Sequence, residues 1–308
     1  MRKKISIDFL TVVGYTESMD NKNIRARAMP GRRYIAAFTA AIFLLIIQFC
    51  SPHDSADTRA QRRFRFIFAS DVHYGEGGKA DSAILANVLD EWKTKVFSWN
   101  FAVLLGDLTT DGDIGLMESL KKGLDNLHKP YFTEIGNHDI TEPGEEGKEN
   151  YVTVFGNNRL NYLIMYKNVG LVFLDLSNDA KAQVTVKVST KLWLKKVLAN
   201  FPRKMPIIVF SHYPLHPETP RFAVMNSGEL FQYLDNRNVL AYLSGHYHGQ
   251  WFGIRNKIPF FTNVRLLPNV DLDHPYPESG YYVVDVFGSS VSMSFRRTRD
   301  ISPANQQK

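Results

Sequence analysis

The chain has 308 residues, of which 44% are hydrophobic and 22% charged, as is usual for a globular protein. Its formal net charge is +6, but residues 1–63 hold 11 Lys and Arg against 5 Asp and Glu, which leaves 26 of each sign in residues 64–308. Composition therefore gives no indication that the globular part binds nucleic acid. The lone cysteine, Cys50, excludes an intrachain disulfide framework and a thiolate zinc site.

The N-terminal segment has the layout of an export signal. Arg32 and Arg33 precede an apolar run over residues 35–49, which ends at Cys50 and a polar stretch. This run is shorter than the ~20 residues that span a bilayer, and it resembles a secretory signal. A cysteine at the end of such a run is similar to a bacterial lipoprotein signal, in which Cys50 would carry lipid, although Phe49 replaces the usual small residue. An uncleaved signal anchor and a buried core element remain alternatives.

We therefore expect a leader over residues 1–63, with residues 51–63 as a polar tether, and an exported protein attached to the membrane of the bacterial cell envelope. Met29 is an alternative start to Met1, because it would give the apolar run a compact basic head. A catalytic domain is predicted over residues 64–297 and a disordered tail over residues 298–308. The sequence does not indicate an oligomeric state.

The first half of this domain alternates between strand and helix patterns. Apolar and β-branched runs predict strands at 65–70, 101–105 and 131–135, and helical spacing predicts helices at 80–99 and 114–127. This βαβαβ layout predicts a largely parallel sheet. The second half is richer in strands, predicted at 161–166, 171–176, 207–211, 239–244, 259–263, 281–286 and 291–295, with helices at 191–200 and 228–236. No linker interrupts the pattern, so we expect one α/β domain built on two sheets.

Residues that can carry chemistry occur in five short blocks, most of them directly after an apolar run. The blocks are Asp71-Val72-His73, Gly106-Asp107, Gly136-Asn137-His138-Asp139, His212 and Gly245-His246-Tyr247-His248. Parallel strands bring their carboxyl ends to one edge of a sheet, where ligands bind in open α/β folds. Each histidine taken alone would more often have a structural role. Together the carboxylate, imidazole and amide groups form a ligand set for two hard or borderline divalent metals.

The order and form of these blocks resemble the calcineurin-like metallophosphoesterase superfamily, over roughly residues 64–248. The resemblance implies a four-layer sandwich of two mixed β-sheets flanked by helices, with a dinuclear metal site at the carboxyl ends of the strands. It assigns one ion to Asp71, His73, Asp107 and His248. It assigns the second ion to Asp107, Asn137, His212 and His246, so that Asp107 bridges the two. Mn, Fe, Zn or a similar metal would suit these ligands.

The same resemblance implies a metal-dependent phosphoester hydrolase, in which a metal-bridging hydroxide attacks a phosphodiester or phosphomonoester in line. It makes His138 a general acid or a stabiliser of phosphoryl charge, with Asp139 orienting its ring. Thr110, where purple acid phosphatases have tyrosine, and His73 in the first block favour the cyclic-nucleotide phosphodiesterase-like branch. A small-molecule or lipid-linked phosphoester is the expected substrate. The alternative is a non-catalytic surface binding protein that keeps the fold and uses metals for structure.

Three further segments are expected around the site. Residues 75–79 lack the spacing of a phosphate-binding loop and are expected to form a flexible loop at the site mouth. Residues 140–160 and 214–228 are expected to carry the substrate contacts. His216, close to His212 in the chain, either lines the pocket or packs outside it.

Overall fold

The computed structural model describes residues 11–13, 62–94, 97–178, 180–268 and 278–298. Met29, the apolar run 35–49, Cys50 and the tail from residue 299 lie outside the described residues. Within the described part of the chain, no helix is long and apolar enough to cross a membrane. Thr298, which the sequence places in the tail, is buried, and its backbone N–H donates to the Ser279 carbonyl.

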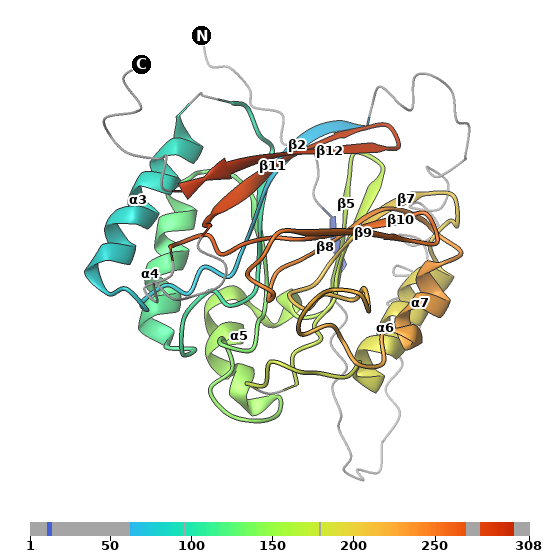
Figure 1. The fold of residues 1–308 in the computed structure, drawn as a ribbon, viewed down its shortest axis with the longest axis horizontal. Helices are drawn as coiled ribbons and strands as arrows, with labels where there is room; N and C mark the ends of the chain where they lie inside the picture. The colour runs from blue at the N-terminus through green and yellow to red at the C-terminus, as the bar shows by residue number, and fades with distance from the viewer. Residues whose placement is uncertain (1–10, 14–61, 95–96, 179, 269–277, 299–308) are drawn as a thin grey trace, which may run out of the picture.

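Two mixed β-sheets form the centre of the molecule (Figure 1). The five-stranded sheet has the order β12-β11-β2-β3-β4, built from β2 (Arg63–Ser70), β3 (Phe101–Leu105), β4 (Tyr131–Glu134), β11 (Gly280–Phe287) and β12 (Ser290–Arg297). The seven-stranded sheet has the order β1-β5-β6-β7-β8-β10-β9, built from β1 (Thr11–Val13), β5 (Tyr162–Tyr166), β6 (Val169–Phe173), β7 (Pro206–Phe210), β8 (Asn238–Ser244), β9 (Trp251–Arg255) and β10 (Ile258–Thr262). In each sheet the inner strands run parallel. Antiparallel pairs are added by β11 and β12 in the five-stranded sheet, and by β5 with β1 and by β9 in the seven-stranded sheet.

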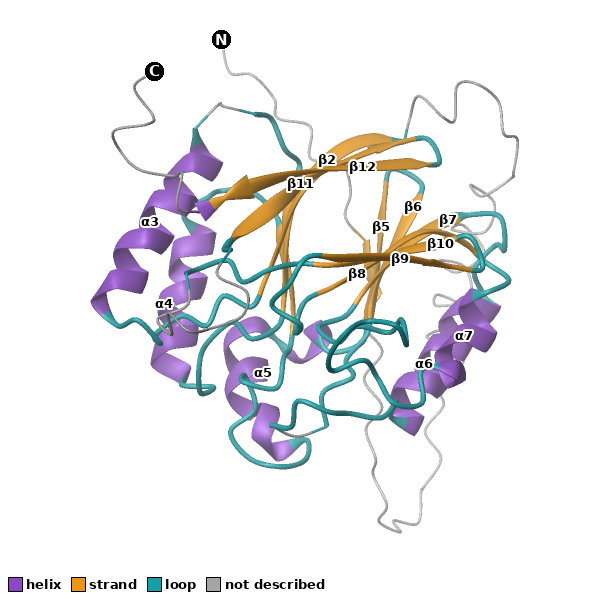
Figure 2. Ribbon diagram, viewed as in Figure 1, coloured by secondary structure: helices purple, strands orange, loops and turns teal. Residues whose placement is uncertain are grey.

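Helices cover the outer face of each sheet (Figure 2). The five-stranded sheet carries α3 (Lys79–Lys93), α4 (Ile114–Asp125) and α5 (Glu149–Phe155), and the other carries α6 (Val188–Ala199) and α7 (Gly228–Leu234). One-turn 3₁₀ helices occur at Glu146–Lys148 and Asn157–Arg159. Three apolar cores fill the spaces between these four layers. The expected four-layer α/β sandwich is confirmed.

The core between the two sheets is rich in aromatic side chains. Phe66 and Phe101 stack with ring centroids 5.1 Å apart, and Phe173 and Phe210 stack at 4.6 Å. Offset stacking of buried rings stabilises a core by about 0.5–1.5 kcal/mol per pair beyond area burial. Of these strands, β2, β3 and β7 end at or next to blocks of the predicted site, so the packed sheets fix where those blocks lie.

Some predicted elements differ from the structure at their ends. The predicted helix 80–99 ends at Lys93, because Thr94 turns to an extended conformation and its Oγ1 donates to the Glu91 carbonyl. The strand predicted at 171–176 lies at Val169–Phe173. The sequence missed three short elements: β9, α5 and β1. β1 lies in the predicted leader, and it pairs antiparallel with β5 of the seven-stranded sheet.

Candidate metal centre

Loops after five strands carry the predicted ligands to one place. Asp71 and His73 follow β2, Asp107 follows β3, Asn137 follows β4, His212 follows β7, and His246 and His248 follow β8. Five of these seven residues have left-handed backbone conformations, which residues other than glycine rarely adopt. They are Asp71 (φ 51°), His73 (φ 47°), Asp107 (φ 47°), His246 (φ 65°) and His248 (φ 58°). Such conformations cost of order 1–3 kcal/mol each and cluster at functional sites. The fold therefore holds these side chains at an energetic cost.

Two glycines let the loops approach one another. Gly106 has φ +65°, and a Cβ there would lie 2.5 Å from the His212 ring, so the close approach expected at this position is present. A Cβ on Gly136 would overlap the backbone nitrogen and Oδ1 of Asp107. The structure shows that close approach to Asp107 is what requires glycine there.

The first group of donors is Asp71, His73, Asp107 and His248, whose ligand atoms all lie within 4.8 Å of one another. His73 Nε2 is 3.2 Å from His248 Nε2 and 3.5 Å from Asp107 Oδ2. His248 Nε2 is 3.4 Å from Asp71 Oδ1. Ligands about 2.0–2.2 Å from one ion lie roughly 3–3.5 Å from each other, so these spacings fit a metal.

The second group shares Asp107 with the first. His212 Nε2 is 3.3 Å from Asp107 Oδ2, 3.1 Å from His246 Nδ1 and 3.3 Å from Asn137 Oδ1. Asp107, His212 and His246 again have ligand atoms within 4.8 Å of one another. A single oxygen, Asp107 Oδ2, therefore faces both groups. The structure brings all seven predicted ligands together in the two expected sets.

Backbone carbonyls select the ring nitrogen that each of two histidines presents. His212 Nδ1 is 3.0 Å from the Leu105 carbonyl, and His246 Nε2 is 2.6 Å from the Ala182 carbonyl. A nitrogen that faces a carbonyl must carry the proton, which leaves the other nitrogen with its lone pair. The free lone pairs are then on His212 Nε2 and His246 Nδ1, the atoms that face the second group.

Peptide N–H groups hold the two carboxylates. The His138 N–H donates to Asp107 Oδ1 at 2.9 Å, so Oδ2 is the oxygen left for metal. The His246 N–H donates to both oxygens of Asp71, at 2.9 and 3.1 Å. Each ligand-bearing loop thus orients a carboxylate from another loop, and the groups form as a unit.

The electrostatics leave most donors in the form that metal binding requires. Burial lowers the pKa of His73 to about 3 and that of His246 to about 4, so both rings are neutral near pH 7. Burial tends to raise the pKa of Asp107, but the neighbouring His212 outweighs it and holds that pKa well below its usual range. Burial by itself would lower the pKa of His212, because it disfavours the charged ring. The carboxylates around His212 outweigh this effect and raise its pKa to about 10. His212 is thus the ligand that must give up a proton when metal binds.

His138 lies beside the donors rather than among them. Its side chain is exposed, and its ring centroid is 4.8 Å from that of His73. Its Nδ1 is 2.8 Å from the Thr110 carbonyl, which fixes the proton on Nδ1 and leaves Nε2 facing away from this contact. The sequence did not predict this contact of Thr110, since any residue can supply a carbonyl.

Asp139 does not make the expected contact with the His138 ring. One of its oxygens accepts the N–H groups of Leu108 (2.8 Å) and Thr109 (3.0 Å), and the other accepts that of Gly136 (2.9 Å). Burial and the nearby Asp107 carboxylate raise its pKa to about 7. Asp139 ties the loop after β3 to the loop after β4, so it positions Asp107 and Asn137 relative to each other.

The structure also shows the contacts of His216 and of the segment 75–79, both of which the sequence placed near the site. His216 packs against the rings of Trp251 and Phe260, with centroids 4.8 and 5.2 Å away. The glycine-rich segment 75–79, expected to be flexible, is tied down because Asp81 Oδ2 accepts the N–H groups at positions 75 and 77. An ion pair between Glu76 and Arg265 holds the same segment.

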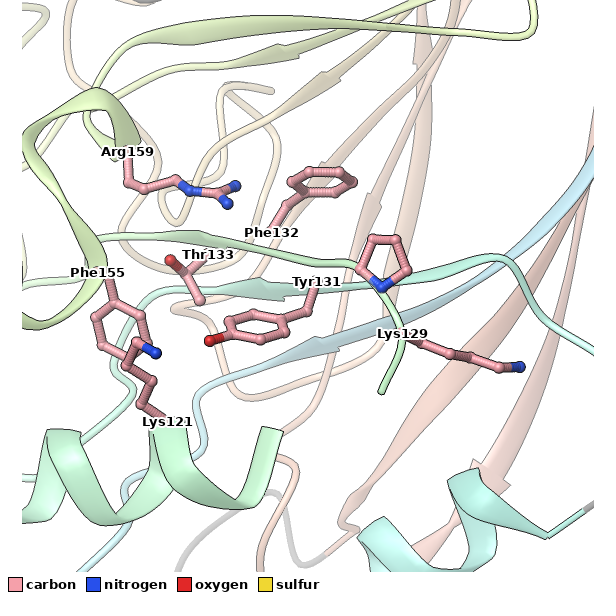
Figure 3. Close-up of a pocket in the computed structure, with 8 residues that line it drawn as sticks. Lys121, Lys129, Tyr131, Phe132, Thr133, Phe155 and Arg159 are labelled. Atoms are coloured by element: carbon pink, nitrogen blue, oxygen red, sulfur yellow. The ribbon is translucent and has the colours of Figure 1, made fainter. Parts of the chain in front are cut away.

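A separate hollow of about 400 Å³ lies at the edge strand β4, between α4 and the turn at Arg159 (Figure 3). Its two lysines already have partners: Lys121 Nζ donates to Asp125 at 2.6 Å, and Lys129 Nζ donates to the Trp99 carbonyl at 2.9 Å. Arg159 lies over the Phe132 ring. None of the seven metal ligands lines this hollow, so it is not part of the candidate metal centre.

Comparison with known proteins agrees with this geometry. The model of the calcineurin-like phosphoesterase family matches residues 64–250. The chain belongs to this family. A protein named Probable glycerophosphodiester phosphodiesterase GpdQ, from Arcobacter nitrofigilis, is 27% identical over 179 residues, which make up 56% of this chain and 66% of that protein. The chain of this calcineurin-like phosphoesterase therefore matches just under two thirds of its relative's length.

Solved structures share the fold at low sequence identity. Purple acid phosphatase PPD1 from yellow lupin (Lupinus luteus) matches with a TM-score of 0.58 and 14% identity, over 78% of this chain and 52% of that chain. GAP50, described as the anchor in the inner membrane complex of Plasmodium, matches with a TM-score of 0.53 and 17% identity, over 78% and 86% of the two chains. TT1561 of Thermus thermophilus matches with a TM-score of 0.51 and 12% identity, over 76% and 99%. These likenesses show the two-sheet fold.

Proposed function

We propose that the chain is a phosphoester hydrolase that uses two divalent metal ions, held by the two donor groups that share Asp107. The observation that carries this proposal is the single oxygen, Asp107 Oδ2, which lies 3.5 Å from His73 Nε2 in one group and 3.3 Å from His212 Nε2 in the other. When bound, a pair of such ions supplies Lewis-acid stabilisation of phosphoryl charge and a nucleophilic water near neutral pH.

The chain's own residues provide orientation and a proton. The exposed His138 ring, held through Nδ1 by the Thr110 carbonyl, presents Nε2 to a substrate above His73. A protonated Nε2 can donate a hydrogen bond to a phosphoryl oxygen, or a proton to the leaving-group oxygen as its bond to phosphorus breaks. Such a positioned acid contributes typically ~10²–10⁴-fold in rate.

A phosphodiester fits the site better than a phosphomonoester. The loop that follows Asp139 exposes three carboxylates, on Glu142, Glu145 and Glu146, of which Glu145 is paired with Lys148 at 3.1 Å. This acidic rim repels a dianionic monoester more strongly than a monoanionic diester. The similarity to a protein named as a glycerophosphodiester phosphodiesterase supports the same class of substrate. Export and attachment to the cell-envelope membrane, suggested by the apolar run 35–49, would place small or lipid-linked phosphodiesters within its reach.

The test is turnover of bis-p-nitrophenyl phosphate and p-nitrophenyl phosphate by metal-free protein reloaded in turn with Mn²⁺, Fe²⁺, Zn²⁺ and Mg²⁺. We expect metal-dependent turnover with kcat/KM higher for the diester. Neutralising the rim in Glu142→Gln/Glu145→Gln/Glu146→Gln should raise kcat/KM for the monoester more than for the diester. A variant with Asp90→Asn, an exposed residue on α3, serves as the matched control. Two bound ions without turnover of either ester would instead support the metal-stabilised binding protein.

A further inference from the structure

The parallel strands of the two sheets run in the same direction. The carboxyl ends of β2, β3, β4, β7 and β8 all meet at the metal centre, so the amino ends of these strands lie together at the opposite end. We call this the basal end and define it by the connections 62–63, 126–130, 167–168, 200–205, 235–237, 256–257 and 288–289. Hydrogen bonds join these connections: Gly288 N–H donates to the Arg62 carbonyl, and Lys167 Nζ donates to the Arg63 carbonyl.

The basal end is strongly basic. Five of its cations are exposed, namely Arg63, Lys167, Arg203, Lys204 and Lys257, and Lys129 and Arg237 are half-buried there. Within the basal connections the described residues include one acid, Asp235, and it is already paired with Arg255 at 2.7 Å. Burial and the neighbouring Arg203 lower the pKa of Arg237, which shows how closely the charges crowd. Residues 64–308 carry no net charge, so this excess is local.

The metal end carries the opposite charge on its surface. Exposed acids there include Asp111, Glu142, Glu145, Glu146 and Glu218, and they outnumber the exposed cations Lys79, Lys181 and Arg221. The molecule is therefore charged along its strand axis, basic at one end and acidic at the other. A negatively charged surface attracts the basal end and repels the rim of the site, so it orients the protein as well as binding it.

The first strand after the apolar run begins at the same end. β2 begins at Arg63, beside the β11–β12 turn, and both lie at the end of the sandwich away from α5 (Figure 1). Only 13 residues separate Arg63 from the end of the apolar run at residue 49. Thirteen extended residues reach at most about 45 Å. If that run is held in a bilayer, the basal end stays close to the lipid, and Phe287, which is 58% exposed there, can enter the interface.

We propose that the basal end docks on the anionic lipid headgroups of the membrane that holds the leader, and that the metal centre consequently faces away from that membrane. Each Lys or Arg near an anionic leaflet strengthens binding by roughly fivefold, and the attraction falls off within a Debye length. Five exposed cations on one face are enough to make the docked orientation the major one at physiological salt.

The experiment is hydrogen exchange on the full-length protein bound to phosphatidylcholine vesicles, with and without phosphatidylglycerol. With the anionic lipid, we expect slower exchange at residues 167–168, 203–205 and 256–257 and unchanged exchange at residues 142–148. High salt should remove the difference. Arg203→Glu/Lys204→Glu/Lys257→Glu should lower the ratio of docked to undocked protein by on the order of 100-fold. The control reverses three exposed cations at the metal end, Lys79→Glu/Lys181→Glu/Arg221→Glu, and should keep the protection.

Equal exchange at the basal connections with and without phosphatidylglycerol would overturn the proposal, whether or not the leader holds the protein on the vesicle. So would an equal loss of protection in the basal and control variants, since that would reduce the effect to net charge. Protection of the same connections by a double-stranded DNA fragment, but not by the anionic vesicles, would assign the surface to nucleic acid instead.

Discussion

The same strands carry two different kinds of loop at the two ends of this sandwich. At the metal end, residues such as Asp71 and His246 take up left-handed backbone conformations and bury charged groups against one another. At the basal end, tight turns such as Lys167–Asn168 and Asn256–Lys257 take up similar conformations, but their side chains are exposed. The comparison shows that strain by itself does not mark a site. Strain together with buried, convergent donors does.

The two ends also differ in how their charged side chains are held. At the metal end, peptide N–H groups and carbonyls fix each donor, as the His138 N–H does for Asp107. At the basal end, five cations are exposed and no buried carboxylate holds them, so they can respond to a large, diffuse anionic partner. Substitutions of residues of one type at the two ends should therefore have different effects.

Replacing a histidine at each end should separate catalysis from surface charge. We expect His138→Ala to lower kcat by about 10²–10⁴-fold while the metal content stays at that of the wild type, because the ring supplies a proton and no metal ligand. His128→Ala, an exposed histidine at the basal end, is the matched control and should leave kcat unchanged. The measurement is steady-state kinetics with metal analysis of both proteins. Loss of metal from His138→Ala, or wild-type turnover by it, would remove the assigned role.

Replacing an aspartate at each end should separate buried from exposed ion pairing. Asp175, buried just after β6, accepts hydrogen bonds from Lys148 and Lys187, each at 2.6 Å. Asp175→Asn should destabilise the fold by about 3 kcal/mol, because it leaves the two lysines with the exposed Glu145 as their remaining carboxylate partner, at 3.1 and 3.6 Å. Asp235→Asn breaks a more exposed pair with Arg255 and should cost about 1 kcal/mol or less. Urea unfolding of the two variants measures both changes, and similar values would contradict the distinction.

The contribution of Asp175 to stability should depend on pH in a predictable direction. Burial opposes ionisation of Asp175, but Lys187 and Lys148 outweigh it and lower its pKa below the ordinary value of 3.8. A carboxyl whose pKa is depressed by folding contributes stability above its unfolded pKa, and that stability is lost as the pH falls through the folded value. The wild type should therefore lose its advantage over Asp175→Asn below about pH 4. A difference in unfolding free energy that stays constant down to pH 2 would speak against the pair.

Charge reversal at the basal end should have the smallest effect on chemistry. Arg203→Glu/Lys204→Glu/Lys257→Glu lies at the far end of the strands from Asp107, so kcat/KM for a soluble diester should change by less than about twofold. Assays of the wild type and this variant on bis-p-nitrophenyl phosphate give the comparison. A larger change would mean that the two ends are coupled through the sheets.

The ligands could be predicted from sequence because each chemistry-bearing side chain follows a strand in a fixed order, as Asp107 follows residues 101–105. The contacts that tune them could not. Thr110 and Ala182 act through their carbonyls, which every residue has, and Asp139 binds N–H groups that only the folded loops bring near. The basal end was also hidden, because its cations are dispersed along the chain and only the strand directions collect them.

The most direct test of the shared ligand is the metal content of Asp107→Ala. Its Oδ2 is the one donor common to both groups, so we expect the wild type and Asp90→Ala to bind two ions per chain and Asp107→Ala to bind fewer than one. His246→Ala removes a donor from the second group alone and should keep one ion. Circular dichroism confirms that each variant is folded. Two ions retained by folded Asp107→Ala would contradict the shared-ligand centre on which the proposed function rests.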